Sequence, residues 1–397
     1  MNEEQRLRTR LEAVDVPPTS VEVAAVIRAG RRIAVRRRAT QAAGGVALVA
    51  SVLLAVPAIL SRVGVQPAVQ VGKTADRTST APSTGPARTT APASSVASCQ
   101  MTKLPVPSGM TDATADAVDP TGRYAVGNST VGEDFRAILW TGGQPRALPL
   151  KGKSVQATAV NASGVVVGIV TNAPTQESVF RYENGAYTML QAPRGNWNPF
   201  PSPAINAAGD VVVNVEPIGN VEGKGSIALL WKAGSTIAVK LPLPAGANVF
   251  AIEDDGTLVG TTYKDGVGVA GYAWDQRGGG RKLAEPAGQT TAAYAARGDW
   301  AAGGVWPAMS AALWNLRTGA VTTLGAPGLG PGDAVNTSGW VVAGGSVLRA
   351  GGSVKLVVPG GQTSRATGLS DTGLVVGQSI INGRNGVKIV GPRMWRC

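Results

Sequence analysis

Aromatic and polar side chains gather in one proline-rich connection of this chain, residues 191–203, whose sequence is QAPRGNWNPFPSP. The members with binding chemistry are Arg194, Trp197, Asn198 and Phe200. Two apolar rings in a surface loop can form a platform for a sugar ring or a peptide, and they can equally pack on the strands beneath them. We predict that this segment contacts a ligand.

Two other predicted loops carry further residues of this kind. Tyr263, Lys264 and Asp265 lie in one loop, and Trp306 lies in another. Binding residues commonly occupy such loops on a rigid scaffold. With the four residues above, they form the predicted ligand-binding set.

Histidine is absent from the whole chain. Its absence excludes His general bases, His-containing catalytic triads and His metal ligands. A glycan hydrolase or lyase would therefore depend on two acids about 5–10 Å apart in a cleft. The acids considered for this role are Glu133, Asp134, Glu216, Glu222 and Asp265. We assign no catalytic residue, and we expect no metal and no cofactor.

The two cysteines, Cys99 and Cys397, stand at the two ends of the predicted outer domain. Two thiolates alone make a poor zinc site. A disulfide is the better interpretation, and it fits an oxidising compartment.

A repeat of roughly 40 residues predicts the elements that position these side chains. Seven segments such as ATAVNASGVVVG align on a turn glycine, and the glycines are separated by 42, 45, 47, 42, 41 and 34 residues. These glycines are Gly122, Gly164, Gly209, Gly256, Gly298, Gly339 and Gly373. An aromatic residue follows in most repeats and is expected to pack between repeats: Trp140, Tyr182, Trp231, Trp274 and Trp314.

Each repeat predicts four short antiparallel strands, which is the blade of a β-propeller. The first strand is rich in Ala and ends at an Asn/Asp-x-x-Gly turn, where Gly can adopt positive φ. The acids of these turns, Asp119, Asp255 and Asp371, are expected to form the turns rather than to catalyse. The sequence thus predicts an all-β, seven-bladed β-propeller at residues 99–397.

The ends of the predicted propeller complement each other. The seventh repeat stops at MWRC, with Trp395 in the aromatic position and no fourth strand after it. The domain begins with an unassigned strand, CQMTKLPVP, at residues 99–107. We predict that this strand completes the last blade and that the disulfide joins the two ends there.

The pattern A-x-A-x-N-x-x-G-x-V-V-G followed by A-x-L-W-x-x-G resembles the HAF-type extracellular repeats of bacterial secreted proteins. The resemblance covers about residues 110–397, with Ala-Ile-Leu-Trp, Ala-Leu-Leu-Trp or Ala-Ala-Leu-Trp in place of the His-Ala-Phe element. The sixth repeat is short and has Leu348 and Arg349 in the aromatic region. The resemblance implies a propeller-like fold outside the cell and no particular activity.

An uncharged apolar segment of 23 residues, 39–61, is long enough to span a membrane as a helix. Six arginines lie between Arg28 and Arg38, immediately before it, so we expect residues 1–38 to be a basic, helical cytoplasmic segment. A cleaved signal peptide and a buried soluble helix are the alternatives to a membrane anchor. Residues 62–98 are rich in Thr, Ser, Pro and Ala and are expected to form an extended linker.

The net charge of +12 does not point to nucleic acid, because residues 1–98 alone contribute +7 beside the apolar segment. The predictions together describe a single-pass membrane protein with its C-terminal domain outside the cell. Its expected function is to bind or scaffold a protein or glycan, with no nucleic-acid partner. The alternatives are a carboxylate-based glycan hydrolase or lyase, and a sensor that signals through residues 1–38.

Overall fold

The computed structural model describes residues 98–397 except 133, 174–175, 219–224, 265 and 384–385. The predicted cytoplasmic segment, membrane helix and nearly all of the linker lie outside the described residues, and so does Asp265. Within the described part, no helix has the length and apolar character needed to cross a membrane.

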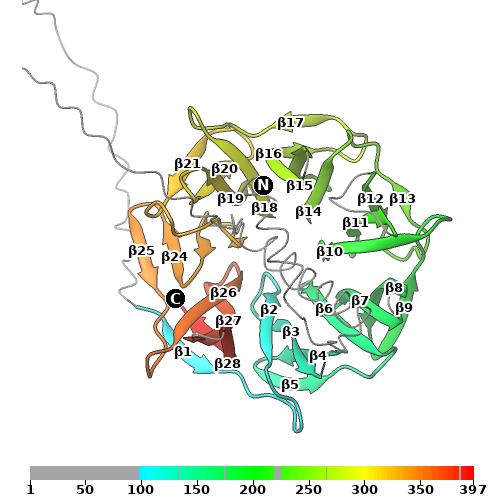
Figure 1. Ribbon diagram of the computed structural model, residues 1–397, viewed down its shortest axis with the longest axis vertical. Helices are drawn as coiled ribbons and strands as arrows, with labels where there is room; N and C mark the ends of the chain where they lie inside the picture. The colour runs from blue at the N-terminus through cyan, green and yellow to red at the C-terminus, as the bar shows by residue number, and fades with distance from the viewer. Residues whose placement is uncertain (1–97, 133, 174–175, 219–224, 265, 384–385) are drawn as a thin grey trace, which may run out of the picture. The chain divides into compact units, whose positions relative to one another are not determined.

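The described residues form seven four-stranded antiparallel sheets arranged as blades around a common axis (Figure 1). Blades 1 to 3 consist of β2 (Thr114–Val118), β3 (Tyr124–Val131), β4 (Asp134–Thr141) and β5 (Gln144–Ala147); β6 (Ser154–Val160), β7 (Val166–Ala173), β8 (Gln176–Glu183) and β9 (Ala186–Leu190); and β10 (Trp197–Ile205), β11 (Val211–Pro217), β12 (Ile227–Trp231) and β13 (Val239–Lys240). The seven-bladed propeller predicted from the repeat is confirmed.

Blades 4 to 6 follow the same strand order. They consist of β14 (Ala247–Ile252), β15 (Leu258–Lys264), β16 (Val267–Trp274) and β17 (Gly280–Lys282); β18 (Thr290–Arg297), β19 (Trp300–Trp306), β20 (Ser310–Asn315) and β21 (Val321–Leu324); and β22 (Ala334–Val335), β23 (Val341–Ala343), β24 (Ser346–Arg349) and β25 (Gly352–Lys355). The short sixth repeat therefore still builds all four strands. Leu348 is buried where other blades have an aromatic ring.

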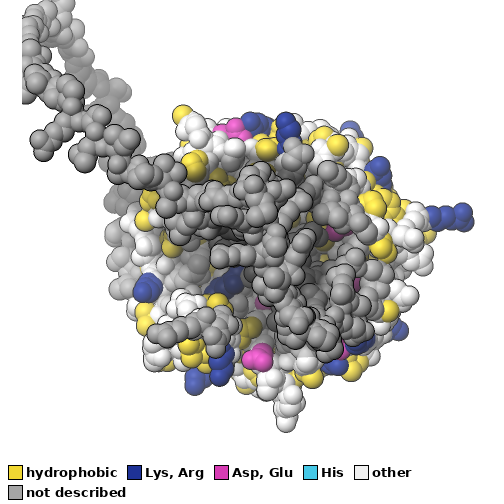
Figure 2. Space-filling model, in the orientation of Figure 1, with side chains coloured by type: hydrophobic (Ala, Val, Ile, Leu, Met, Phe, Trp, Pro, Cys, Tyr) yellow, Lys and Arg dark blue, Asp and Glu magenta, His cyan; other side chains and the backbone are white. Residues whose placement is uncertain are grey.

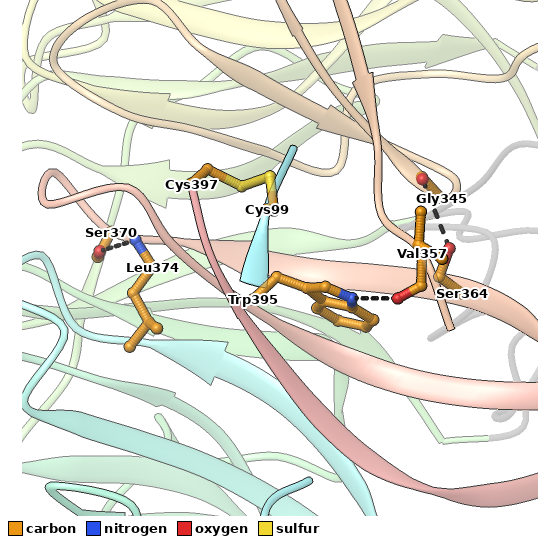
Figure 3. Close-up of a disulfide and its surroundings, with 8 residues drawn as sticks. All are labelled: Cys99, Gly345, Val357, Ser364, Ser370, Leu374, Trp395 and Cys397. Atoms are coloured by element: carbon orange, nitrogen blue, oxygen red, sulfur yellow. Dashed lines mark hydrogen bonds between the residues drawn. A yellow bond between two sulfur atoms is a disulfide. The ribbon is translucent and has the colours of Figure 1, made fainter. Parts of the chain in front are cut away.

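Blade 7 joins the two ends of the propeller. It contains β26 (Thr363–Leu369), β27 (Leu374–Gly383), β28 (Gly386–Arg396) and, as its outermost strand, β1 (Gln100–Lys103). Met101 pairs with Trp395 across β1 and β28. The Cys99–Cys397 disulfide lies beside this pair (Figure 3). The predicted closure of the ring and the predicted disulfide are both confirmed.

The repeated tryptophans connect neighbouring blades, as predicted. Trp231 of blade 3 is buried, and its indole N–H donates to the Gln191 carbonyl at the end of blade 2. Trp395 makes the equivalent bond to the Val357 carbonyl at the end of blade 6 (Figure 3). Each such bond satisfies the indole N–H while the ring fills the space between two sheets.

The seven turn glycines all have positive φ, between 61° and 92°. In several turns the Asn or Asp three positions earlier accepts backbone N–H groups of its own turn. Asn161, for example, accepts from Ser163 and Val165, and Asp119 accepts from Thr121 and Tyr124. This pairing of an Asx side chain with a left-handed glycine explains the Asn/Asp-x-x-Gly spacing.

A second glycine of the repeat, on the second strand, is needed for a different reason. The first strand of most blades contains a β-bulge, as between Ala115 and Ala117 or between Val249 and Ala251. A Cβ atom on the facing glycine, Gly127 or Gly260, would collide with a backbone carbonyl of that strand. Only glycine therefore tolerates the close approach at the bulge.

Candidate functional site

The first strands of the blades surround a central channel (Figure 1). The channel contains a cavity of about 230 Å³ whose lining residues come from β2, β6, β10, β14, β18, β22 and β26 and from turns that follow these strands, among them Asp254 and Asp371. Small residues such as Ala117, Ala159 and Gly368 form much of its wall. We call the end where first strands turn into second strands the turn end. The opposite end, where first strands begin and second-to-third hairpins lie, is the loop end.

An ion network spans the turn end of the channel. Arg297 of blade 5 donates to Asp371 of blade 7 through Nε at 3.0 Å and to Asp254 of blade 4 through Nη1 at 2.9 Å. Asp254 also accepts from the Ala207 N–H of blade 3, and Asp371 accepts from the Thr337 N–H of blade 6. Five blades are therefore tied together at this end.

Asparagine side chains at the turn end add bonds from blade to blade. Asn161 donates to the Asn206 carbonyl, and Asn206 donates to the Glu253 carbonyl. Among the described residues, no buried side-chain polar atom of these turns is without a partner. Polar groups at the turn end thus serve the fold itself.

The loop end differs, because buried polar atoms without a hydrogen-bond partner among the described residues gather there. They belong to residues between the bulges and the loop end: Trp197, Asn198, Ser226, Asn248, Gln289, Asp333, Gln362, Gln378, Ser379 and Arg393. Most of these atoms are acceptors, namely amide or carboxyl oxygens. A buried polar atom without a partner costs stability, so a concentration of them at one end needs an explanation in function.

Three charged side chains interact across blades 6, 7 and 1 at this end. Desolvation raises the pKa of the Asp116 carboxyl to about 6, while hydrogen bonds from Asn128 and Thr114 and the charge of Arg365 oppose the rise. Burial also raises the pKa of Asp333 well above its usual value, again opposed by Arg365. The charge of Arg365 on blade 7 thus acts on the carboxyl groups of both adjacent blades.

Aromatic rings form the adjoining part of the wall on blades 4 and 5. Phe250 and Tyr294 line the cavity, with ring centroids 5.5 Å apart in an edge-to-face arrangement. Tyr263 lies 6.4 Å from Phe250, and Trp306 lies 6.4 Å from Tyr294. Burial raises the pKa of Tyr263 to about 12, and a side-chain hydrogen bond joins it to Tyr294. These phenols are therefore neutral donors and acceptors.

The structure distributes the predicted binding residues over several places. Tyr263 and Trp306 belong to the aromatic group described above, and Lys264 ends β15 beside them. Arg194 is exposed before β10. Asp265 lies outside the described residues.

The predicted loop over residues 191–203 is wrong in its second half. Residues from Trp197 onward form β10, in which Trp197 pairs with Pro217 and Phe200 pairs with Asn214. Trp197 packs against the blade core instead of standing free. The prolines are accommodated because β10 is an edge strand of its sheet and its register shifts between Phe200 and Ala204.

The acids considered for catalysis are only partly described, because Glu133, Glu222 and Asp265 lie outside the described residues. Glu216 is buried on β11. Burial raises the pKa of Glu177 on the neighbouring blade, and the charge of Glu216 raises it further. The charges of these two acids thus influence each other at the loop end.

A second cavity of about 280 Å³ lies at the turn end between blades 4 and 5. Its lining includes Glu253, whose pKa burial raises to about 7 while the Gly298 N–H and Arg297 oppose the rise. Asp299 in the same wall is paired with Arg317 at 2.7 Å. The acids of its lining thus interact with residues of the turns and of the neighbouring blade.

Sequence reasoning missed Asp116, Asp333 and Arg365, because they lie within or next to predicted first strands. A signal was present: Asp116 interrupts the small residues of ATADAV, and Arg365 precedes the equivalent ATGL. Charged residues are unexpected on the innermost strand of a propeller unless the channel uses them.

On the visible face, basic side chains do not gather in one patch. Figure 2 shows Lys and Arg at scattered positions around the rim of the visible face. The absence of a nucleic-acid partner stays a prediction.

No protein-family model matches the sequence, and no curated protein matches it. Among solved structures, oligogalacturonate lyase from Vibrio parahaemolyticus is similar in fold, with a TM-score of 0.53 and 10% identity over 75% of this chain and 97% of that one. The propeller domain of the Trilobed protease from Pyrococcus furiosus gives a TM-score of 0.43 and 13% identity, over 62% of this chain and 82% of that one.

TolB from Acinetobacter baumannii gives a TM-score of 0.34 and 15% identity, and the match spans 44% of this chain and 43% of TolB. At 10% identity, the similarity to the oligogalacturonate lyase shows the propeller fold alone. The resemblance to HAF-type repeats stays a prediction.

Proposed function

We propose that this chain is a single-pass membrane protein whose propeller binds or scaffolds a protein or glycan outside the cell. The observation that carries the proposal is the contrast between the two channel ends. Polar groups at the turn end bond one another, whereas buried acceptors at the loop end have no partner among the described residues. A ligand would supply those missing partners.

The proposed location rests on two features. A disulfide between Cys99 and Cys397 fits an oxidising compartment. Residues 39–61 are apolar and follow an arginine-rich segment, which favours an N-terminus inside and a propeller outside. The linker gives the propeller reach from the membrane.

Accessibility on intact cells tests the location. A protease that cannot enter cells is expected to remove the linker and release the propeller with its disulfide intact. Protection of the propeller until the cells are lysed would contradict the proposed topology.

Binding is tested with the purified full-length chain, presented to a glycan array and to an extract of cell-envelope proteins. Specific capture is expected from one of the two. The Asp333→Ala and Asn248→Ala variants are expected to weaken it, because each removes an acceptor at the loop end. An absence of capture from both sources would contradict the proposal.

A carboxylate-based glycan hydrolase or lyase is the second candidate, and the Glu177–Glu216 pair favours it. Two acids with an elevated pKa on one of them can act as general acid and base. Release of new sugar ends from a bound glycan, abolished in Glu177→Gln and Glu216→Gln variants, would support this activity. Intact glycan after prolonged incubation would contradict the enzyme activity and leave binding as the proposed function.

The sensor alternative depends on residues 1–38. Deletion of residues 2–30, with the propeller kept at the membrane, should abolish a cellular response if the segment signals. An unchanged response would exclude that role.

A further inference from the structure

Arg393 is a cation that blade 7 buries without a counter-charge. It lies on β28 and is only 5% exposed. Its Nη1 donates to the carbonyl of its own neighbour, Pro392, whereas its Nε is buried and has no partner among the described residues. Desolvation lowers the pKa of Arg393, and no described acid lies near enough to raise it. Because a buried charge is costly unless it is paired, this site lacks an anion.

The unpaired edge of this guanidinium is one that binds carboxylates. Since Nη1 is engaged by Pro392, Nε–H and the neighbouring Nη2–H have no partner in the described part of the chain. Nη2 is not among the enclosed atoms, so a ligand can reach this edge. Two parallel N–H donors match the two oxygens of a carboxylate. Arg297 uses the same edge within this protein, because its Nε and Nη2 each lie 3.0 Å from Oδ2 of Asp371.

Comparison with the other blades shows that packing does not require a charge at this position. Arg393 lies two residues before Trp395 on β28. Blades 1 to 5 have an apolar or aromatic residue two positions before their repeated aromatic: Ile138, Phe180, Leu229, Tyr272 and Ala312. An aliphatic side chain would fill the same space between two blades without the cost of desolvating a charge. The arginine of blade 7 therefore needs an explanation other than packing.

The strands on both sides of β28 add to the positive character of the site. Lys103 on β1 is exposed and lies directly opposite Arg393, and like charges in that relation repel each other. Ser379 on β27 pairs with Gly391, two residues before Arg393, so its side chain points to the same face. The hydroxyl oxygen of Ser379 is buried and has no partner among the described residues. An anion here would relieve the repulsion and accept a bond from the hydroxyl.

Blade 6 ends early beside this site. Its strands β23 and β24 are joined at Gly344 and Gly345, whereas β27 and β28 of blade 7 continue to Gly383 and Gly386. The Ser364 hydroxyl donates to the Gly345 carbonyl (Figure 3), and Ser364 pairs with Ser379 on β27. The hairpin of blade 6 therefore ends at the level of Ser379. A ligand can approach from the loop end without displacing the strands of this hairpin.

We propose that Arg393 binds a carboxylate group of a ligand between blades 6 and 7. Nε–H and Nη2–H hold its two oxygens, the Ser379 hydroxyl donates to one of them, and Lys103 attracts the anion from solvent. The single charge of a carboxylate matches the single unpaired cation, whereas a phosphate would bring further oxygens into an enclosed space. This assignment goes beyond the proposed function, because none of these three residues lines the channel cavity.

Thermal unfolding of the full-length chain in sodium acetate tests the assignment. Acetate replaces sodium chloride at constant ionic strength, and the Arg393→Leu variant measures the general effect of the salt on stability. A ligand that binds only the folded protein raises its melting temperature. In 200 mM acetate, the rise should be about 2 °C larger for the unaltered chain than for Arg393→Leu. Equal rises in the two proteins would overturn the assignment.

Two further variants test the geometry of the site. Arg393→Lys keeps the charge but lacks the two parallel donors, so it should lose most of the acetate effect. It also serves as the reference if Arg393→Leu does not fold. Arg396→Leu, at an exposed position on the same strand, is the matched control and should respond to acetate as the unaltered chain does. A full acetate effect in Arg393→Lys would overturn the paired binding of two oxygens.

Sodium phosphate at the same ionic strength distinguishes the two classes of anion. A larger difference between the unaltered chain and Arg393→Leu in phosphate than in acetate would reject a carboxylate as the ligand. Failure of the acetate effect would leave the proposed binding function standing, because that function is tested separately with the Asp333→Ala and Asn248→Ala variants.

Discussion

Asp116 and Asp333 are carboxyl groups in surroundings that disfavour their charge. Each lies on or beside the first strand of its blade, where neighbouring residues are mostly Ala and Val. An acid with a raised folded-state pKa binds its proton more tightly in the folded protein than in the unfolded chain. The contribution of these two groups to the stability of the fold is therefore most favourable at low pH and weakens as pH rises.

This linkage predicts a pH dependence. The pKa of Asp116 rises from 3.8 to about 6 on folding, so its penalty is absent below pH 3.8 and complete above pH 6. The Asp116→Asn variant should lack the corresponding loss, which is about 3 kcal/mol. Urea unfolding of both proteins from pH 3.5 to 7 measures it. Parallel stability curves would show that Asp116 is not desolvated.

A second prediction concerns Asp333, whose Oδ1 is buried without a partner among the described residues. Asp333→Ala removes this unsatisfied atom, and the free energy of unfolding should rise by about 1 kcal/mol. Thermal unfolding at pH 7 measures the change. A fall of similar size would mean that the attraction between Asp333 and Arg365 outweighs the desolvation.

At the scale of strands, the bulge on the first strand and the glycine facing it form one unit. The carbonyl displaced by the bulge occupies the space of a side chain on the second strand. In three blades, the Asn or Thr that follows this second-strand position hydrogen-bonds to the N–H and the C=O of a single residue in the next blade. Asn128 does so with Ala157, Asn214 with Val249, and Thr261 with Ala293.

Gly260→Ala is therefore expected to destabilise the protein by about 1–3 kcal/mol, because its Cβ meets the Asn248 carbonyl. Gly143→Ala is the control. Gly143 has a φ of 83° and open space around its Cβ, so only backbone strain of about 1 kcal/mol applies. Denaturant unfolding compares the two. A smaller loss for Gly260→Ala than for Gly143→Ala would contradict the steric explanation.

Closure of blade 7 is the other prediction at this scale. The disulfide joins residues 298 positions apart, so the unfolded chain gains much freedom when the bond is removed. The Cys99→Ser/Cys397→Ser variant should lose up to about 5 kcal/mol of stability. The four residue pairs between β1 and β28 should still hold the blade closed at low temperature. Melting curves of the unaltered chain and of the variant, each with and without reductant, measure the effect. Reductant should lower the melting temperature of the unaltered chain and leave that of the variant unchanged.

At the scale of the whole propeller, the two ends of one channel differ in their hydrogen bonding. The network of Arg297, Asp254 and Asp371 ties distant blades together, whereas several buried acceptors at the loop end have no partner among the described residues. Under the proposed function, residues that stabilise the ring and residues that bind lie on opposite sides of the bulges.

Arg297→Ala tests this division. It should lower the free energy of unfolding by about 1 kcal/mol, because the ion pairs are partly exposed, and should leave ligand affinity unchanged. Asp333→Ala should raise the free energy of unfolding and weaken ligand binding. Denaturant unfolding and titration on the same samples compare them. Loss of affinity in folded Arg297→Ala would show that the two ends are coupled.

The sequence by itself determined the number of blades, their four strands, the closing strand and the disulfide. These features depend on local turn chemistry and on repetition, both of which are visible along the chain: Asn161 and Gly164 define a turn wherever the rest of the blade lies. Tyr263 and Trp306 were also predicted as binding residues, on the ground that they follow second strands.

Only the tertiary structure decided which side chains from different blades meet. Asp116, Asp333 and Arg365 are far apart in the sequence, and their interaction exists because three first strands converge on one axis. The placement of Trp197 in β10, where the sequence predicted a loop, has the same cause. This irregular, proline-containing strand is stabilised by its pairing with β11. Local propensity does not encode such pairings, because they depend on contacts between residues from 20 to 249 positions apart.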